Sequence, residues 1–222
     1  MPNWCYNNLE INGDEKSIRA LRERAVEKDE KGNINIFSFE KFVPTPPEKL
    51  KDGDWYDWRC ANWGTKWNTD EPSFGSDENR YDYLAYNFDT AWSPPVEFIE
   101  KLSGMYPSLT FKMTFEEGGC DIYGEVTYEN GECTDQKEYT WEQWLEQNED
   151  YMAFKEEVME MTSEQAIKAL EEHSNDIEHW SPIEKLILSK IEDKDLPLLI
   201  NHDWFDCNDE YIERMKKPKG GI

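Results

Sequence analysis

The histidines are the residues of this sequence that could most readily act as catalytic bases or metal ligands. There are three, His173, His179 and His202, and all lie in the last quarter of the chain. His173 and His179 are six residues apart, so they do not share a helix face as ligands four residues apart would. The sequence holds no GxSxG, HExxH, Walker or GxGxxG template. We therefore expect no enzyme and no catalytic residues, and an active site assembled from Asp, Glu and Tyr stays open as an alternative.

A group of oxygen ligands near the C-terminus is the nearest approach to a metal site. Asp203, Asp206 and Asp209, with Asn201 and Asn208, lie in the segment NHDWFDCNDEYIE. This composition is typical of a calcium loop, but the glycine that permits the sharp turn of such a loop is missing. The five cysteines lie far apart and form no CxxC pair, which argues against a zinc knuckle or a disulfide framework. We expect no metal and no cofactor.

Acidic side chains dominate the charge of the chain and constrain its partners. There are 49 acidic and 24 basic residues, a formal charge of -25. Such a surface repels nucleic acids and membranes and attracts proteins with basic surfaces. The candidate partner-binding residues are carboxylates of predicted C-terminal helices: Glu142, Glu146, Glu149, Asp150, Glu156, Glu157, Glu160, Glu171 and Glu172. The alternative is a solvated acidic surface that serves only solubility.

Aromatic residues on predicted strands allow another interpretation, in which the sheet stacks on the bases of RNA. The rings are Tyr83, Tyr86, Phe88, Phe111 and Phe115. Nucleic-acid binding depends mainly on positive charge that meets phosphate, and the charge of this chain opposes it. Direct binding of nucleic acid is therefore not expected.

Hydrophobic periodicity predicts an α+β domain over residues 1–138. Alternating residues predict strands over residues 3–11, 58–68, 81–92 and 109–117, with a further hairpin strand from Ile122. Helical spacing of apolar residues, with Asp14 and Ser93 as caps, predicts helices over residues 14–31 and 94–106. The Pro-rich segment 44–57 predicts a loop. This order fits a ferredoxin-like antiparallel sheet of four or five strands with two helices on one face.

The sequence after Glu138 predicts a separate acidic helical extension, residues 139–222. Three helix-start signatures occur there, Thr140 to Gln143, Thr162 to Gln165 and Ser181 to Glu184. No apolar run in the chain reaches the roughly 18 residues that a membrane span needs, and no leader pattern precedes Leu9. We therefore expect no membrane association, with residence in the cytoplasm of a host cell and reduced thiols.

Three short stretches each contain tryptophan, and the first two also contain asparagine: MPNWCYN, NWGTKW and TAWSPP. Their principal residues are Trp4, Asn7, Asn62, Trp63, Trp67 and Trp92. Asparagine amides bond backbone groups at strand ends, and each tryptophan offers a large apolar face and one N–H donor. We interpret these residues as mainly structural, a packed and hydrogen-bonded corner, and a ligand pocket made of the same groups is the alternative.

In order and spacing, the three stretches resemble the YubB ferredoxin-like or Api92-like family of phage and plasmid proteins. The resemblance covers about residues 1–130 and implies a ferredoxin-like domain carried on mobile genetic elements, without catalytic residues to transfer. With the acidic extension, it leads us to expect a non-catalytic accessory protein that binds and inhibits or modulates a host protein, such as a counter-defence factor that mimics nucleic acid. A nucleic-acid-binding regulator that uses the aromatic sheet face, or an uncharacterised enzyme with a Trp-lined site, is the alternative.

Overall fold

The computed structural model describes residues 3–75, 81–173 and 181–192, and the chain divides into two compact units, Met1–Trp144 and Leu145–Ile222. The strands are β1 Trp4–Gly13, β2 Glu27–Lys28, β3 Ile34–Asn35, β4 Asp70–Phe74, β5 Tyr83–Ala91, β6 Leu109–Glu117, β7 Ile122–Glu129 and β8 Glu132–Tyr139. The helices are α1 Glu15–Ala25, the 3-10 turn η1 Phe39–Lys41, α2 Pro47–Asp52, α3 Trp55–Trp63, α4 Val96–Met105, α5 Trp141–Leu145, α6 Glu149–Glu160, α7 Ser163–His173 and α8 Ser181–Lys190.

The first unit is built on one six-stranded antiparallel sheet in the order β4-β5-β1-β6-β7-β8. β1 and β4 are joined through α1 and have β5 between them, while β5 and β6 are joined through α4 and have β1 between them. These two interleaved split βαβ units are the ferredoxin-like arrangement, and β7 and β8 extend its edge. At the two edges, β4 shifts its register against β5 between Asp70 and Ser73, and β8 is exposed along nearly its whole length.

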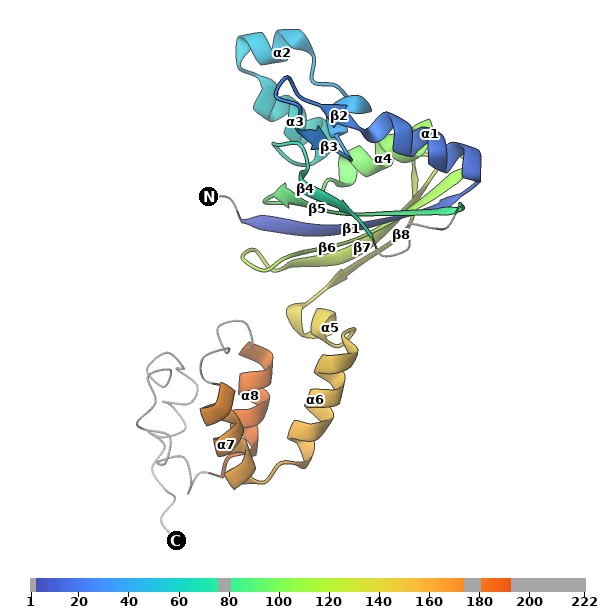
Figure 1. The fold of residues 1–222 in the computed structure, drawn as a ribbon. Helices are drawn as coiled ribbons and strands as arrows, with labels where there is room; N and C mark the ends of the chain where they lie inside the picture. Colours follow the sequence, from blue (N-terminus) through green and yellow to red (C-terminus); the bar gives the residue numbers. More distant parts are fainter. Residues whose placement is uncertain (1–2, 76–80, 174–180, 193–222) are drawn as a thin grey trace. The chain divides into compact units, whose positions relative to one another are not determined.

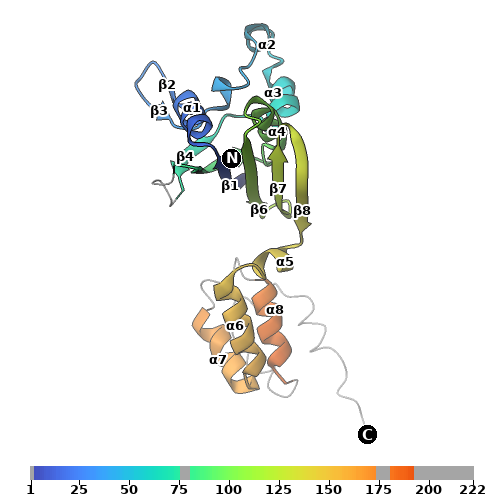
Figure 2. The ribbon, with the colours of Figure 1, turned by 90° about the vertical axis from the view of Figure 1, so that its right-hand side faces the viewer.

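Helices α1 and α4 lie on the same face of this sheet, as Figures 1 and 2 show. Between them and the sheet is an aromatic core in which Phe37 stacks on Tyr86, with ring centroids 4.4 Å apart, and Phe39 stacks on Phe98 at 4.0 Å. Alternate residues of the central strands enter this core, so the period of two that predicted strands 3–11, 81–92 and 109–117 is confirmed. The prediction of an α+β unit with two helices on one sheet face is confirmed.

The predicted strand over residues 58–68 is wrong, because this segment begins inside helix α3. Asn62 donates through Nδ2 to the carbonyl oxygen of Trp58 one turn earlier, at 2.7 Å. Gly64 ends the helix with φ at 81°, and its N–H bonds the carbonyl oxygen of Cys60. A left-handed glycine after the last turn is a standard helix end, and it outweighs the strand preference of the tryptophans.

Three other boundaries differ from the predictions. The expected loop 44–57 contains α2, because Pro47 at the first helical position is already set to helical φ. The helix expected over residues 14–31 is capped by Asp14 as predicted, but it ends at Ala25 and gives way to β2. The helix expected from residue 94 begins at Val96, and the expected cap Ser93 donates instead to the carbonyl oxygen of Gly64 at 2.6 Å. β4, between the predicted strands 58–68 and 81–92, and β8, after the predicted hairpin, were not predicted. With the strand 58–68 absent, these two bring the sheet to six strands instead of four or five.

The opposite face of the sheet carries polar side chains and is partly covered by α5. The rings of Trp141 and Trp144 lie 5.1 and 6.1 Å from that of Tyr123 on β7, which attaches the start of the predicted extension to the first unit. Thr140 and Gln143 form the predicted reciprocal cap of this helix. The division between the units therefore falls at Trp144, beyond the predicted boundary at residue 138.

The second unit is helical in the residues that the structure describes. α6, α7 and α8 pack around a small core of Val158, Ala166, Ile187, Leu188 and Ile191. Figure 2 shows the three helices side by side. The predicted reciprocal cap between Thr162 and Gln165 starts α7. Among the described residues, no helix combines the length and the apolar character that a membrane span requires.

The buried Trp63 generates the first testable prediction. Its side chain is 0% exposed, and its indole Nε1 donates to the carbonyl oxygen of Val43 at 2.9 Å. Replacing Trp63 with Ala should lower the free energy of unfolding by about 3–5 kcal/mol, because the change leaves a large cavity and an unpaired carbonyl. Urea denaturation measures the loss. Tyr56→Ala on the same helix is the control, since Tyr56 is 50% exposed, and equal losses in the two variants would contradict the packing described.

Glu125 on the polar sheet face generates a prediction of pH dependence. Its carboxylate accepts from Lys137 Nζ at 2.5 Å and from the Tyr139 hydroxyl at 3.2 Å, and lies 3.1 Å from Lys112 Nζ. These partners, Lys137 first, lower the pKa of Glu125 to about 2 from its ordinary value of 4.5. A carboxyl with a lowered pKa stabilises the folded state above its ordinary pKa, and this stabilisation is lost as the pH falls from 4.5 toward about 2.

We therefore expect Glu125→Gln to lose roughly 1–3 kcal/mol of unfolding free energy at neutral pH, and progressively less as the pH approaches 2. Urea unfolding of both proteins across this pH range measures the difference. Glu132→Gln on the exposed strand β8 is the matched charge control. A loss that does not change with pH would show that Glu125 acts only through packing.

Candidate functional site

The three Trp-bearing motifs meet at one end of the sheet. Asn7 of the first motif is 4% exposed, and its Nδ2 donates to the Cys5 and Phe88 carbonyl oxygens and to Thr90 Oγ1, at 2.9, 3.2 and 3.0 Å. Thr90 in turn donates to the carbonyl oxygen of Ser93 at 2.8 Å. One buried amide thus ties the first motif to the third across β1 and β5.

The second motif is joined to the same corner. Thr65 donates to the carbonyl oxygen of Ala91 at 3.0 Å, which links NWGTKW to TAWSPP. Asn62 accepts through Oδ1 from Lys101 Nζ on α4, at 2.6 Å. These contacts make Asn7, Asn62 and Trp63 part of the structural framework of the first unit, as the interpretation of the motifs as mainly structural requires.

The other three motif tryptophans are more accessible. Trp67 and Trp92 are 38% and 44% exposed, and the ring centroids of Trp4 and Trp67 lie 6.2 Å apart. Lys66 places its ammonium 4.0 Å from the centroid of the Trp67 ring. Trp92 has φ at 75°, a left-handed conformation that is costly for a bulky residue.

The thiol at this corner is not a nucleophile at neutral pH. Cys5 is 0% exposed, and its burial raises the pKa of the thiol to about 12. Since the thiolate is the reactive form, this side chain is inert. Among the described residues, no group of three His, Cys, Asp or Glu side chains has a geometry that could hold a metal ion.

The predicted partner-binding carboxylates lie on α5, α6 and α7. Glu146, Glu149, Glu156, Glu157 and Glu160 are exposed in the second unit, and Glu142 is exposed on α5 of the first. Glu146 accepts from Lys155 Nζ at 2.5 Å. Within the described part of the chain, no ion pair neutralises Glu149, Glu156, Glu157 or Glu160. The side chains of Asp150, Glu171 and Glu172 lie outside the described residues.

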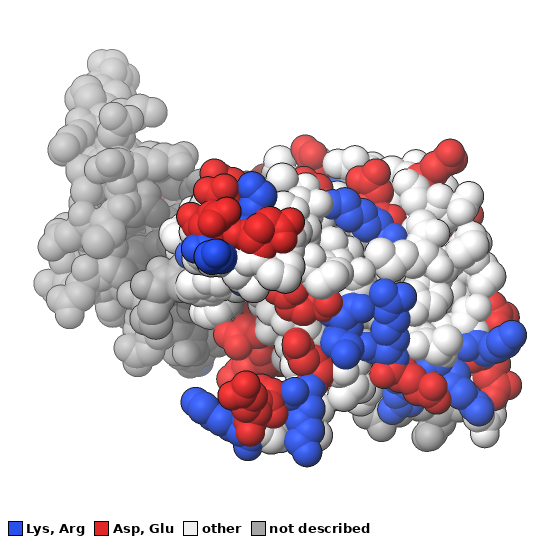
Figure 3. All heavy atoms as spheres, turned by 90° about the horizontal axis from the view of Figure 1, so that it is seen from above, with Lys and Arg blue, Asp and Glu red and all other residues white. Residues whose placement is uncertain are grey.

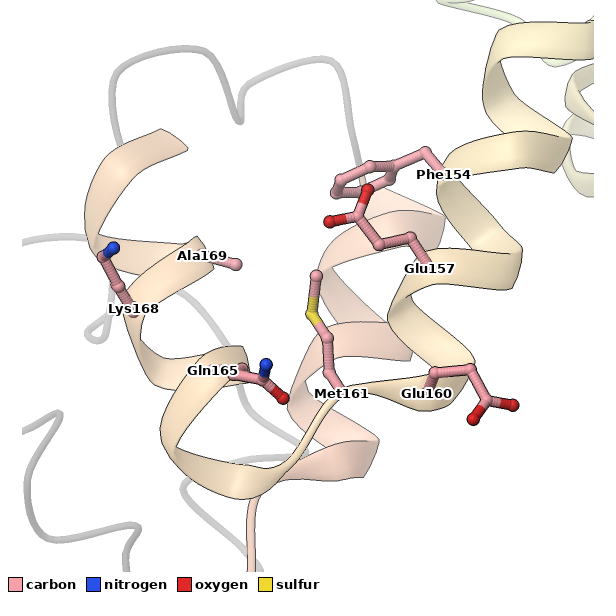
Figure 4. Close-up of a pocket in the computed structure, with 7 residues that line it drawn as sticks. All are labelled: Phe154, Glu157, Glu160, Met161, Gln165, Lys168 and Ala169. Atoms are coloured by element: carbon pink, nitrogen blue, oxygen red, sulfur yellow. The ribbon is translucent and has the colours of Figure 1, made fainter.

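Two carboxylates of α6, Glu157 and Glu160, belong to the lining of a groove that could not be predicted from the sequence. A cavity of about 340 Å³ lies between α6 and α7 and is lined by Phe154, Glu157, Glu160, Met161, Gln165, Lys168 and Ala169. Figure 4 shows Glu157 beside the ring of Phe154 and facing Met161, whereas Glu160 points away from the cavity. The groove thus combines apolar side chains, Phe154, Met161 and Ala169, with polar ones that include both Glu157 and Lys168.

Charge on the first unit is distributed differently. On the face seen in Figure 3, lysines and arginines are interspersed with carboxylates. Within the first unit, Arg59 pairs with Glu40 at 2.7 Å and Lys49 with Asp54 at 3.2 Å. This face therefore presents no field of a single sign.

The positions of the five rings that could stack on RNA argue against that role. Tyr86, Phe88, Phe111 and Phe115 point into the core beneath the helices and are at most 6% exposed. Of the five, Tyr83 alone lies on the helix-free face, because it alternates with the buried Leu84 and Tyr86. An aromatic sheet face made of these five residues does not exist. His179, His202 and the group of Asp203, Asp206 and Asp209, with Asn201 and Asn208, lie outside the described residues, as does the side chain of His173.

The left-handed Trp92 generates a prediction about backbone strain. Trp92→Gly should be more stable than Trp92→Ala by about 1 kcal/mol, because only glycine adopts a positive φ without cost. At Trp67, whose φ is not positive, the order should reverse, with Ala more stable than Gly by roughly 0.5–1 kcal/mol. Thermal denaturation of the four variants measures both differences. The same order at both positions would contradict the strained conformation of Trp92.

Comparison with known proteins gives the following similarities. Residues 62–161 match the family model described as a ferredoxin-like domain in Api92-like protein. The crystal structure of protein api92 from Yersinia pseudotuberculosis is similar at a TM-score of 0.47 and 13% identity, over 63% of this chain and 98% of that one. No curated protein matches the chain.

The residues that match the family model differ from the range, about residues 1–130, over which the motifs predicted a resemblance. The match contains the second and third Trp-bearing motifs and begins after the first, and it continues beyond residue 130 through α5 and α6. The acidic helix α6 thus falls within the matched domain, although the resemblance in the motifs did not reach it. Residues 62–161 of this chain, which include these two motifs, are therefore similar to the ferredoxin-like domain of Api92-like proteins.

Proposed function

We propose that this chain is a non-catalytic accessory protein of a phage or plasmid that binds a basic, nucleic-acid-handling host protein and inhibits or modulates it. The carboxylates of α6 carry the proposal. They make an exposed negative surface on a short rigid element, and such a surface steers a positively charged groove toward itself. A counter-defence role, in which the helix occupies a channel otherwise filled by nucleic acid, is the specific form of this proposal.

The density of charge on α6 is close to that of a nucleic-acid strand. The 12 residues of α6 span about 18 Å at 1.5 Å per residue, and they include five carboxylates, Glu149, Asp150, Glu156, Glu157 and Glu160. This is one negative charge per roughly 3.6 Å, against about 3.4 Å for one strand of a DNA duplex. The single lysine of α6, Lys155, is bonded to Glu146 outside the helix. In the described part of the chain, Glu149, Glu156, Glu157 and Glu160 are exposed and have no ion pair, so their charge is open to a partner.

The groove beside α6 adds a way to hold basic side chains. Lysine and arginine place their aliphatic stems on apolar surface and keep their charge in contact with water or an acid. Phe154 and Met161 supply such a surface, and Glu157 supplies the acid at its edge. A partner's basic residue can therefore gain apolar contact as well as charge attraction.

The test compares two variants with the same change of charge. In the first, Glu149, Glu156, Glu157 and Glu160 become Gln. In the second, four exposed carboxylates of the first unit, Glu23, Glu30, Glu48 and Glu132, become Gln. Each protein is used to capture partners from nuclease-treated host lysate, and captured proteins are then assayed for displacement of a labelled oligonucleotide by each variant.

We expect the wild-type chain and the first-unit variant to displace the oligonucleotide equally. The α6 variant should need a concentration higher by roughly tenfold or more, because four exposed charges worth a few tenths of a kcal/mol each sum to about 1.4 kcal/mol. If both variants displace the oligonucleotide equally weakly, the effect depends on net charge and not on the position of the carboxylates on α6. Retention of DNA or RNA by the purified chain itself would favour a nucleic-acid-binding regulator.

A further inference from the structure

A cavity of about 230 Å³ lies in the first unit, on the face of the sheet opposite α1 and α4. Its side chains form two rows across β5, β1 and β6: Asp89, Tyr6 and Glu116, then Asn87, Asn8 and Thr114. Trp144 of α5 forms a wall beside them. Backbone of Asn7, Phe88 and Phe115, whose side chains enter the opposite core, forms its floor.

The polar groups of this cavity are held in place by two hydrogen bonds. Trp144 Nε1 donates to Glu116 Oε2 at 2.6 Å, and Asn8 Nδ2 donates to Asn87 Oδ1 at 2.7 Å. Glu116 and Asn87 can each accept a further hydrogen bond, because a carboxylate has a second oxygen and an amide oxygen has a second lone pair. The site is therefore rigid and rich in hydrogen-bond acceptors.

The cavity lacks positive charge of its own. No lysine or arginine is among its lining residues, and the two lysines on the same sheet face, Lys112 and Lys137, both bind Glu125. Burial, with Asp70 and Glu71 nearby, raises the pKa of Asp89. A cation beside Asp89 would offset both the burial of its carboxylate and the repulsion from these two neighbours.

We propose that this cavity receives the guanidinium group of an arginine side chain from a partner protein. A guanidinium offers five donors in a plane, and it stacks on aromatic rings, so it suits acceptors flanked by Tyr6 and Trp144. The volume lies below the roughly 300–1,000 Å³ of pockets for drug-sized ligands, and it is suited to one side chain. An ammonium is less suited, because it is a compact, strongly hydrated charge without the planar face and fixed fork of donors that a guanidinium offers.

This site is separate from the proposed α6 surface, and either can fail without the other. The probe is the capped tripeptide acetyl-Gly-Arg-Gly-amide, with the Lys tripeptide as the comparison. Titration is followed in two-dimensional NMR spectra of the ¹⁵N-labelled full chain, through the indole N–H of Trp144 and the side-chain amides of Asn8 and Asn87.

We expect saturable shifts of these three signals, with the Arg peptide bound at least threefold more tightly than the Lys peptide. Asp89→Asn should weaken the Arg peptide by about tenfold, because it removes one charge-assisted contact. Tyr6→Ala is the second variant, since Tyr6 is 55% exposed and its loss should leave the fold intact while weakening binding. The α6 variant with four Gln substitutions should bind the peptide as the wild type does.

Three outcomes would overturn the proposal: no saturable shift of the Trp144 indole, equal affinity for the Arg and Lys peptides, or shifts that vanish in the α6 variant. The last would place the peptide on the acidic helix. If the chain does not bind the peptide but still displaces the oligonucleotide through α6, the proposed function stands and the arginine site does not. If it binds the peptide but does not displace the oligonucleotide, the arginine site stands and the proposed function does not.

Discussion

A buried amide that must be hydrogen-bonded organises the first unit. Asn7 lies in the interior, where an unpaired N–H or carbonyl would cost about 1–3 kcal/mol, and its Nδ2 has three acceptors on β1 and β5. Thr90, one of these acceptors, turns the chain into the segment that leads to α4, and Ser93 and Thr65 bond that segment to the end of α3. The register of the central strands and the position of the helices above them thus depend on the same network.

Much of the first unit could be predicted from sequence, because its central strands are half-buried and alternate. β6 coincides with the predicted segment, whereas α3 was missed because its tryptophans favour strands and the helix signal is carried by Gly64 alone. β4 was missed because a five-residue edge strand containing Pro72 has almost no apolar alternation. Edge elements depend on neighbours that are distant in sequence, and local patterns do not contain them.

The candidate sites show the same limit. Exposed carboxylates on α6 could be predicted from helical spacing, because a charge run on an amphipathic helix faces solvent. The arginine cavity could not, because Asp89, Tyr6 and Glu116 become neighbours only through the pairing of three strands. The sequence predicts that Trp144 belongs to the helical extension, but in the structure this residue packs on the sheet of the first unit and orients Glu116. Its contacts also explain why the first unit includes the start of α5.

The two outer strands of the sheet have a consequence for how copies of this chain meet. An open sheet exposes unpaired backbone donors and acceptors at its edges, and these can join the sheets of two molecules into larger assemblies. Here Pro72 removes a donor from β4 and the register shift between Asp70 and Ser73 breaks its regular ladder. β8 carries Glu132, Asp135, Lys137 and Glu138 along its exposed length. Both edges therefore disfavour strand addition and protect the protein from edge-to-edge aggregation.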